Sequence, residues 1–113
     1  MLAKANRVVR GADYRLVVRR GRRYPGANTI THVLARDSDA APRFGFIVAK
    51  NVGNAVVRNR VRRRLKAASW ELLSETRPGT DIVVRALPGA ASASWASLRG
   101  ELTTAIERGA ALA

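Results

Sequence analysis

One segment of the chain, residues 50–66 (KNVGNAVVRNRVRRRLK), concentrates side chains that can bind a polyanion. It contains no acidic residue, and its basic residues are Lys50, Arg58, Arg60, Arg62, Arg63, Arg64 and Lys66. Guanidinium groups pair with phosphates through two parallel hydrogen bonds, and ammonium groups act as point charges. A solvated helix normally mixes positive and negative side chains, which this segment does not do. The segment is therefore predicted to bind phosphate groups.

The apolar residues of the same segment predict the helix that positions these cations. From Ala55 to about Arg77 they recur at helical spacing, which draws one stripe along a helix of about 3.6 residues per turn. The stripe consists of Val57, Val61, Leu65, Ala68 and Leu72. At about 100° per residue, the side away from the stripe carries Arg58, Asn59, Arg62, Arg63 and Lys66, with Arg60 on its flank. One face of the helix is thus predicted to enter a core and the other to present dense positive charge.

The entry to this helix adds a second feature that favours phosphate. Val52, Gly53 and Asn54 form a predicted tight turn, in which the glycine takes a positive φ and Asn54 caps the helix. The free N–H groups and partial positive charge of a helix N-terminus attract anions. Lys50 stands just before the turn and supplies a further cation. We therefore include Lys50 and Asn54 in the candidate site.

The composition indicates one globular domain with a polyanionic partner. The 113 residues include 21 Lys and Arg against 8 Asp and Glu, a formal net charge of +13, and 47% of them are hydrophobic. This length fits a single domain, predicted to span residues 1–113 with residues 1–8 mobile. Such an excess of like charge repels itself in the folded state. It therefore indicates a nucleic acid as the first expected partner and an anionic membrane surface as the second.

Several other classes of protein are disfavoured by the sequence. It has no Cys, a single His and scattered acidic residues, so we expect no catalytic residue and no metal site on the protein. No apolar run approaches the roughly 20 residues of a membrane span, and the first residues lack the apolar core of a secretion signal. The absence of cysteine also suits a reducing compartment. The expected location is cytoplasmic, without membrane association.

The patterns along the whole chain predict an α+β fold, an α-β-β-β-α-β-α sandwich with helices packed against a small mixed sheet. Residues 12–20 form the expected first helix, and Ser94 caps the expected last one. The expected strands are 22–24 at an edge, 29–36, 43–49 and 80–87. Residues 37–42 are expected to form a hairpin loop. Residues 43–49 are apolar on both faces, so they are placed centrally in the sheet.

The run GFIVAKNVGNAVVRNRVRRRLK closely resembles the signature of the bacterial ribonuclease P protein component, centred here on Arg58-Asn59-Arg60. The resemblance extends over nearly the whole chain. Further matching positions are Asn6-Arg7, Asp13-Tyr14, Gly21, Asp81-Ile82-Val83-Val84 and Leu98-Arg99-Gly100-Glu101-Leu102. The resemblance implies a compact fold with a left-handed β-α-β crossover through the basic helix. The general handedness rule alone predicts a right-handed crossover between parallel strands.

The resemblance also implies a function. Members of this family bind a large catalytic RNA, and together they remove the 5′ leader of precursor tRNA by endonucleolytic hydrolysis. The RNA carries the active-site Mg²⁺ and performs the reaction, so the protein is an accessory subunit that is not catalytic alone and requires no protein partner. Carried over by position, the residues that face the catalytic RNA are Lys50, Asn54, Arg58, Asn59, Arg60, Arg62, Arg63 and Lys66.

In the family, the cleft that binds the leader lies between the first helix and the sheet. Tyr14 matches an aromatic residue of that cleft and is expected to stack on an unpaired base. Val18 stands where a second aromatic is usual, and His32 occupies a sheet position that is often tyrosine. A core aromatic role for Tyr14 and an ordinary strand position for His32 both stay open at this point.

The sequence also leaves room for structural roles of single residues and for a different class of the whole chain. Asn59 can instead act as a local cap or order an arginine, and Trp70 and Trp95 are expected to be packing residues. A structural RNA-binding protein of the ribosomal-protein type, without a nuclease role, shares the charge and size. The run GNAVVRNR favours the ribonuclease P interpretation instead. A stand-alone nuclease requires carboxylates that gather metal ions, and the sequence shows no such cluster.

Overall fold

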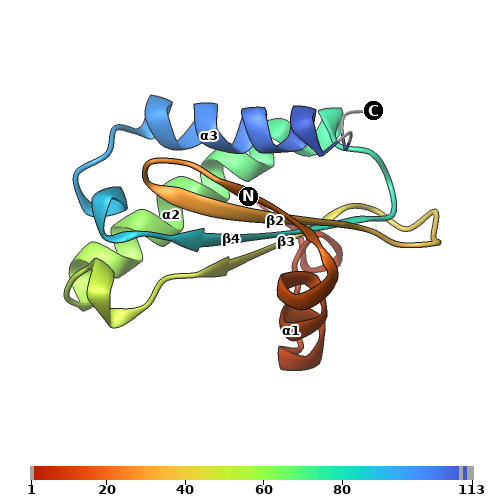
Figure 1. Cartoon of the computed structure of the whole chain (residues 1–113), viewed down its shortest axis with the longest axis horizontal. Helices are drawn as coiled ribbons and strands as arrows, with labels where there is room; N and C mark the ends of the chain where they lie inside the picture. The colour runs from red at the N-terminus through yellow and green to blue at the C-terminus, as the bar shows by residue number, and fades with distance from the viewer. Residues whose placement is uncertain (1, 110, 112–113) are drawn as a thin grey trace.

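The computed structural model describes residues 2–109 and 111. Within these residues, three α-helices pack on a four-stranded mixed sheet. In chain order, the elements are α1 (Gly11–Arg20), β1 (Arg22–Pro25), β2 (Thr29–Ala35), β3 (Arg43–Ile47), α2 (Ala55–Leu72), β4 (Thr80–Ala86) and α3 (Trp95–Arg108). Figure 1 shows α2 and α3 on one side of the sheet and α1 on the other. The predicted α+β class and order of elements are confirmed.

The strands follow the order β1-β2-β4-β3 across the sheet. β2 pairs antiparallel with β1 and with β4, and β3 pairs parallel with β4. Successive side chains of a strand point to opposite faces. Ile82 and Val84 of β4 therefore enter the core beneath α2 and α3, while Val83 points toward α1, and all three are fully buried. Burial on both faces explains why β4 lies inside the sheet.

Two predictions about the sheet were wrong. Residues 37–42 do not form a hairpin loop, because β4 lies between β2 and β3. Residues 43–49 are not central either, since β3 ends at Ile47 and lies at an edge of the sheet. β3 is apolar because Phe44 is buried in the core and because the N-terminal segment covers the outer edge of the strand. There, the backbone N–H of Val8 donates to the carbonyl of Phe44 at 2.9 Å.

Residues 2–8, which the sequence predicts to be mobile, lie against the sheet in the structure. Leu2 and Val8 are buried, and the side chain of Asn6 donates a hydrogen bond to the carbonyl of Pro42 at 3.1 Å. A short 3-10 helix, Lys4–Asn6, joins these contacts. These contacts place residues 2–8 beside β3, their mobility stays a prediction, and Met1 lies outside the described residues.

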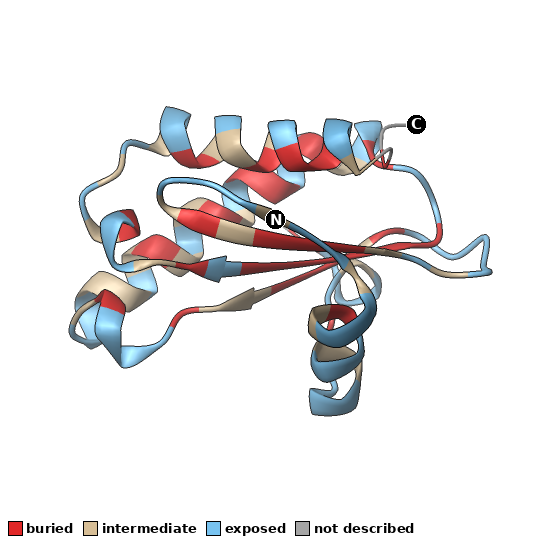
Figure 2. Ribbon diagram, viewed as in Figure 1, coloured by how far each residue is buried: buried red, intermediate tan, exposed pale blue. Residues whose placement is uncertain are grey.

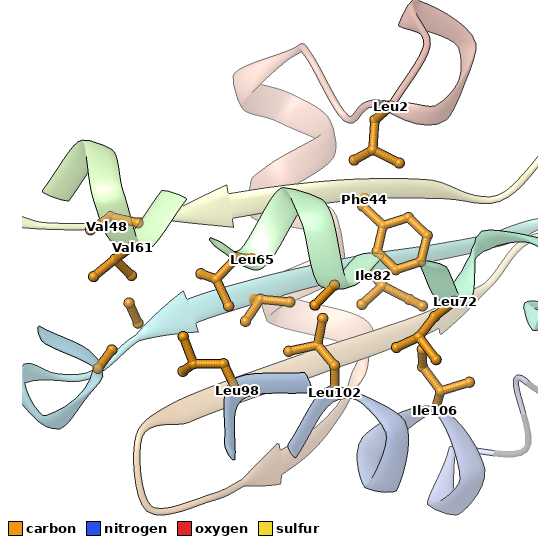
Figure 3. Close-up of a cluster of buried hydrophobic side chains, with 14 of the residues drawn as sticks. Leu2, Phe44, Val48, Val61, Leu65, Leu72, Ile82, Leu98, Leu102 and Ile106 are labelled. Carbon is orange, nitrogen blue, oxygen red and sulfur yellow. The ribbon is translucent and has the colours of Figure 1, made fainter. Parts of the chain in front are cut away.

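The connection from β3 through α2 to β4 is a left-handed crossover, as the resemblance implied. In Figure 3, β3 and β4 both point left with β3 above β4, and α2 lies in front of them. The general preference for right-handed crossovers is therefore overridden in this fold.

The core lies between the sheet and the pair α2 and α3, and Figure 2 shows buried residues on the facing sides of these helices. The predicted stripe of α2 is confirmed, because Val61, Leu65, Ala68 and Leu72 are buried and Val57 packs against them. From α3, Leu98, Leu102 and Ile106 meet this stripe (Figure 3). α2 ends at Leu72, earlier than predicted, and a 3-10 turn follows. No helix of the described residues is long and apolar enough to cross a membrane.

A buried carboxylate connects the sheet to the start of α1. Asp81 is 1% exposed and accepts hydrogen bonds from Nε and Nη2 of Arg43, at 2.9 and 2.7 Å. Nε of Arg36 lies 3.2 Å from the same carboxylate. Arg43 also lies 3.6 Å from Asp13 in the first turn of α1. The hydrogen bond to Asp81 raises the pKa of Arg43, so this guanidinium stays charged.

Removal of this carboxylate is expected to destabilise the fold. Asp81→Ala leaves two guanidinium groups without their partner, and the free energy of unfolding should fall by about 2–4 kcal/mol. The control is Asp37→Ala, at an exposed position outside these ion pairs, which should change it by less than about 0.5 kcal/mol. Urea denaturation of the three proteins measures the difference. Equal stability of Asp81→Ala and wild type would show that the ion pairs make no net contribution to the free energy of unfolding.

Candidate nucleic-acid interface

The N-terminus of α2 has the cap and turn that the sequence predicts. Oδ1 of Asn54 accepts a hydrogen bond from the backbone N–H of Val57 at 3.0 Å. Gly53 has a φ of 155°, and a Cβ atom at this position would overlap the side chain of Val57. The glycine therefore lets the chain turn tightly from the end of β3 into α2, and Lys50 lies exposed just before that turn.

The basic face of α2, defined as Asn59, Arg62, Arg63 and Lys66 opposite its buried stripe, is not neutralised by carboxylates. Arg58 was predicted to lie on this face, but it is seven positions before Leu65 and borders the stripe, with its Nε buried. In the described part of the chain, the ion pairs involve three arginines, Arg36, Arg43 and Arg99, and none of these belongs to residues 50–66. Of the candidate residues, Lys50, Asn54, Asn59 and Arg63 are exposed, and Arg58, Arg60, Arg62 and Lys66 are partly buried. Phosphates can therefore approach this face without breaking an existing ion pair.

A shallow hollow runs along the middle of the basic face. It is lined by Val56, Asn59, Arg62, Arg63 and Lys66. Oδ1 of Asn59 accepts a hydrogen bond from Nη1 of Arg62 at 3.1 Å, which holds that guanidinium in a fixed direction. The hollow thus groups oriented donors along one line, an arrangement suited to a nucleic-acid backbone.

Arg60 differs from its neighbours because the protein itself binds its guanidinium. Nη2 of Arg60 donates to the carbonyl of Ala91, and Nη1 of Arg64 donates to the carbonyl of Ala93, each at 2.9 Å. Both carbonyls lie in the loop that leads into α3, so the two arginines join α2 to this loop. The sequence placed Arg60 on the flank of the helix but did not indicate this internal contact, since Ala91 is 31 positions away.

A second concave surface, the α1 groove, lies on the other side of the sheet. Its lining residues are Tyr14, Arg15, Val18, Arg19, Ile47 and Arg85. The ring of Tyr14 packs so closely on Gly45 that a Cβ atom there would overlap it. The Tyr14 hydroxyl accepts a hydrogen bond from the N–H of Phe46 at 3.2 Å. The structure thus brings Tyr14 and Val18 together and adds three arginines that sequence reasoning had not assigned. Of these three, Arg85 could have been singled out from the sequence, because it is a charged residue within an apolar strand.

His32 lies on the face of the sheet that α1 covers, but it is not among the residues that line the α1 groove. It is 5% exposed, it pairs with Val83 across β2 and β4, and its Nδ1 is buried without a hydrogen-bond partner. Burial lowers the pKa of His32, and the charges of Arg85 and Arg23 lower it further. A neutral, buried imidazole offers little surface for a base to stack on. The leader-binding role of His32 therefore stays a prediction.

Comparison with known proteins identifies the family. The family model for Ribonuclease P matches residues 2–109. This chain belongs to the ribonuclease P protein family. It is 54% identical over 108 residues to the ribonuclease P protein component of Clavibacter michiganensis, with 96% of each chain covered. It is 48% identical over 107 residues to that of Pseudarthrobacter chlorophenolicus, with 95% of this chain and 79% of the relative covered.

Solved structures share the fold of this ribonuclease P protein. The RNase P protein of Staphylococcus aureus matches with a TM-score of 0.83 at 22% identity, over 97% of this chain and 100% of that one. The protein of Thermotoga maritima matches with a TM-score of 0.78 at 20% identity, over 90% and 96%. Ribonuclease P is an endoribonuclease of tRNA processing, so family membership favours this interpretation over a ribosomal-type protein.

The internal contact of Arg60 predicts that this residue supports stability. Arg60→Ala removes a charge-assisted hydrogen bond to a backbone carbonyl and should lower the free energy of unfolding by about 1–2 kcal/mol. Arg63→Ala, an exposed change on the same helix, should alter it by less than about 0.5 kcal/mol. Urea denaturation compares the two variants with wild type. If both variants unfold with the stability of wild type, the contact with Ala91 contributes nothing to the fold.

The lowered pKa of His32 predicts that stability declines between pH 7.5 and 5.5. The unfolded chain takes up a proton near the ordinary pKa of 6.5, whereas the folded chain takes it up only at lower pH. Stability present above pH 6.5 is therefore lost as the pH falls. Since His32 is the single histidine, wild type should lose up to about 1.4 kcal/mol and His32→Gln should lose none. Urea denaturation at both pH values tests this, and equal losses would contradict it.

Proposed function

We propose that this chain is the protein subunit of a ribonuclease P ribonucleoprotein, and that it binds two RNA ligands on two different surfaces. The basic face of α2 binds the RNase P RNA. The α1 groove binds the 5′ leader of precursor tRNA. The observation that carries the proposal is the basic face itself, a row of cations with no carboxylate partner in the described residues, in a chain of the ribonuclease P family.

The basic face suits a large folded RNA because its donors are held on a rigid helix. Asn54 fixes the start of α2, Asn59 orients Arg62, and the buried stripe fixes the rotation of the helix about its axis. Neutralising phosphates with such cations releases the counterions of the RNA, which makes binding favourable and dependent on salt. Such a face suits an RNA that is recognised by its shape and backbone.

The α1 groove suits a single strand because it combines cations with an aromatic ring. Arg15, Arg19 and Arg85 surround Tyr14, Val18 and Ile47. Single-stranded nucleic acid is held by basic grooves that follow its backbone and by aromatic residues on which bases stack. Tyr14 is anchored on one side by Gly45 and Phe46, so its ring is held in place before a ligand arrives.

In this proposal the Mg²⁺ ions are held by the RNA, and they supply the hydrolytic chemistry there. The described residues contain no group of three or more His, Asp or Glu side chains that could hold a metal ion. Asp81 is buried and its carboxylate is bound by Arg36 and Arg43. Glu101 is partly buried, and its carboxylate accepts hydrogen bonds from Asn28 and Thr29. The residues of this chain bind and orient the two RNA ligands.

Reconstitution tests the proposal directly. The protein alone, the RNase P RNA of Clavibacter michiganensis alone, and both together are incubated with precursor tRNA at low Mg²⁺. The two together should release the 5′ leader at least tenfold faster than the RNA alone, and the protein alone should release none. Cleavage by the protein alone would show a stand-alone nuclease. No acceleration of the RNA would favour a structural RNA-binding role.

The α1 groove predicts that Tyr14 distinguishes precursor from mature tRNA. With the reconstituted complex, Tyr14→Ala should weaken precursor tRNA binding by about 1–3 kcal/mol, because a base stack is lost, and should leave mature tRNA binding nearly unchanged. Tyr14→Phe keeps the ring and loses only the hydrogen bond from Phe46, so it should bind precursor tRNA nearly as wild type does. Equal weakening for both tRNAs would remove the leader from this groove.

A further inference from the structure

Trp70 is a large aromatic side chain on the basic face of α2. It follows Lys66 by four positions and Arg63 by seven, so it lies one and two helical turns beyond them on the same side of the helix. It is 52% exposed and outside the hydrophobic core cluster. The expectation that Trp70 is a packing residue was therefore wrong, whereas Trp95 does pack against the core.

The environment of Trp70 indicates what ligand it suits. In residues 2–109 and 111, the one cation placed over an aromatic ring is Arg108 above Tyr24, at 5.8 Å, so no arginine or lysine covers the Trp70 indole. Trp70 lies beyond the residues that line the hollow, and at the N-terminal end of the hollow Val56 is 75% exposed. The two apolar side chains are about 21 Å apart along the helix, at 1.5 Å per residue, with the cations of the hollow between them. Glu71, the next residue, is turned toward α3, where it pairs with Arg99 at 3.1 Å.

We propose that Trp70 is a stacking site for an unpaired base of the RNase P RNA, at the C-terminal end of the basic face. The inference rests on the proposed function. An exposed aromatic ring among cations without carboxylate partners matches a ligand that carries phosphates and flat apolar faces together, and an unpaired nucleotide has both. Arg63 and Lys66 bind the backbone, and the indole receives a base next to it.

Stacking and phosphate contact differ in their dependence on salt, which separates the role of Trp70 from that of Lys66. The full-length protein is titrated with the RNase P RNA of Clavibacter michiganensis at several salt concentrations. Trp70→Leu should weaken binding by about five- to tenfold at every salt concentration and leave the slope of log affinity against log salt unchanged. Lys66→Ala should flatten that slope by about one unit. Trp70→Phe, which keeps an aromatic face, should recover most of the affinity.

Tryptophan fluorescence provides a second readout, because the chain has two tryptophans. In Trp95→Phe, the remaining emission comes from Trp70, and the same RNA should quench it. In Trp70→Phe, the emission comes from Trp95, which is partly buried beside Arg60 and Arg64, and it should change less. Vesicles of phosphatidylglycerol, which present phosphates without bases, should leave the Trp70 emission unchanged.

Several outcomes would overturn the inference. In the titrations, these are an affinity of Trp70→Leu equal to that of wild type at every salt concentration, or a salt slope of Trp70→Leu that flattens as that of Lys66→Ala does. In the fluorescence experiment, they are the absence of quenching of Trp70 by the RNA, or quenching of Trp70 by the vesicles. The inference would also be overturned if the melting temperature of Trp70→Leu fell so far that unfolding accounted for the loss of affinity, because Trp70 would then be structural. If wild type itself does not bind the RNA, the proposed function fails, and that result is distinct from all of these.

Discussion

The structure depends on a single helix that must carry like charges on one face and core residues on the other. Repulsion among neighbouring arginines opposes formation of α2, and no carboxylate within residues 50–66 relieves it. Burial of Val61 and Leu65, which are 1% and 0% exposed, offsets this repulsion by anchoring the helix between the sheet and α3. The helix is further secured by its Asn54 cap and by the contacts of Arg60 and Arg64 with backbone carbonyls.

The position of α2 also separates the two candidate RNA surfaces. The crossover from β3 to β4 places the basic face on one side of the sheet, while α1 and its groove lie on the other (Figure 1). The network of Asp81, Arg43 and Asp13 connects the start of α1 to two strands of the same sheet. One rigid sheet therefore sets the distance between both surfaces, and a single protein can contact two RNA ligands without competition between them.

The α1 groove of this chain depends on charge more than on aromatic surface. Val18 supplies no ring, and His32 is buried beneath α1, so Tyr14 is the aromatic residue that lines the groove. Arg15, Arg19 and Arg85 surround it. On the opposite side of the sheet, Trp70 gives the basic face an aromatic ring of its own. Both surfaces thus combine the same two kinds of side chain, an aromatic ring and several cations.

The sequence by itself determined the features that depend on residues close together in the chain. The apolar stripe of α2, the caps at Asn54 and Ser94, and the positive φ of Gly53 all follow from neighbours within one or two turns. The exposure of Trp70 was not among these features, because a tryptophan is most often a packing residue and was expected to be one here. The run around Arg58-Asn59-Arg60 was enough to indicate the family.

Only the tertiary structure decided which distant residues meet. β4 lies inside the sheet, between β2 and β3, because both of its faces can be buried. The pattern of one strand alone does not show this, because the position depends on how the strands compare with one another. The contact of Arg60 with Ala91 and the burial of His32 under α1 likewise join separate elements. Local patterns report the preference of each segment for a helix, a strand or an exposed face. The pairing of segments depends on the total surface that they bury together, which is settled only when the whole chain is packed.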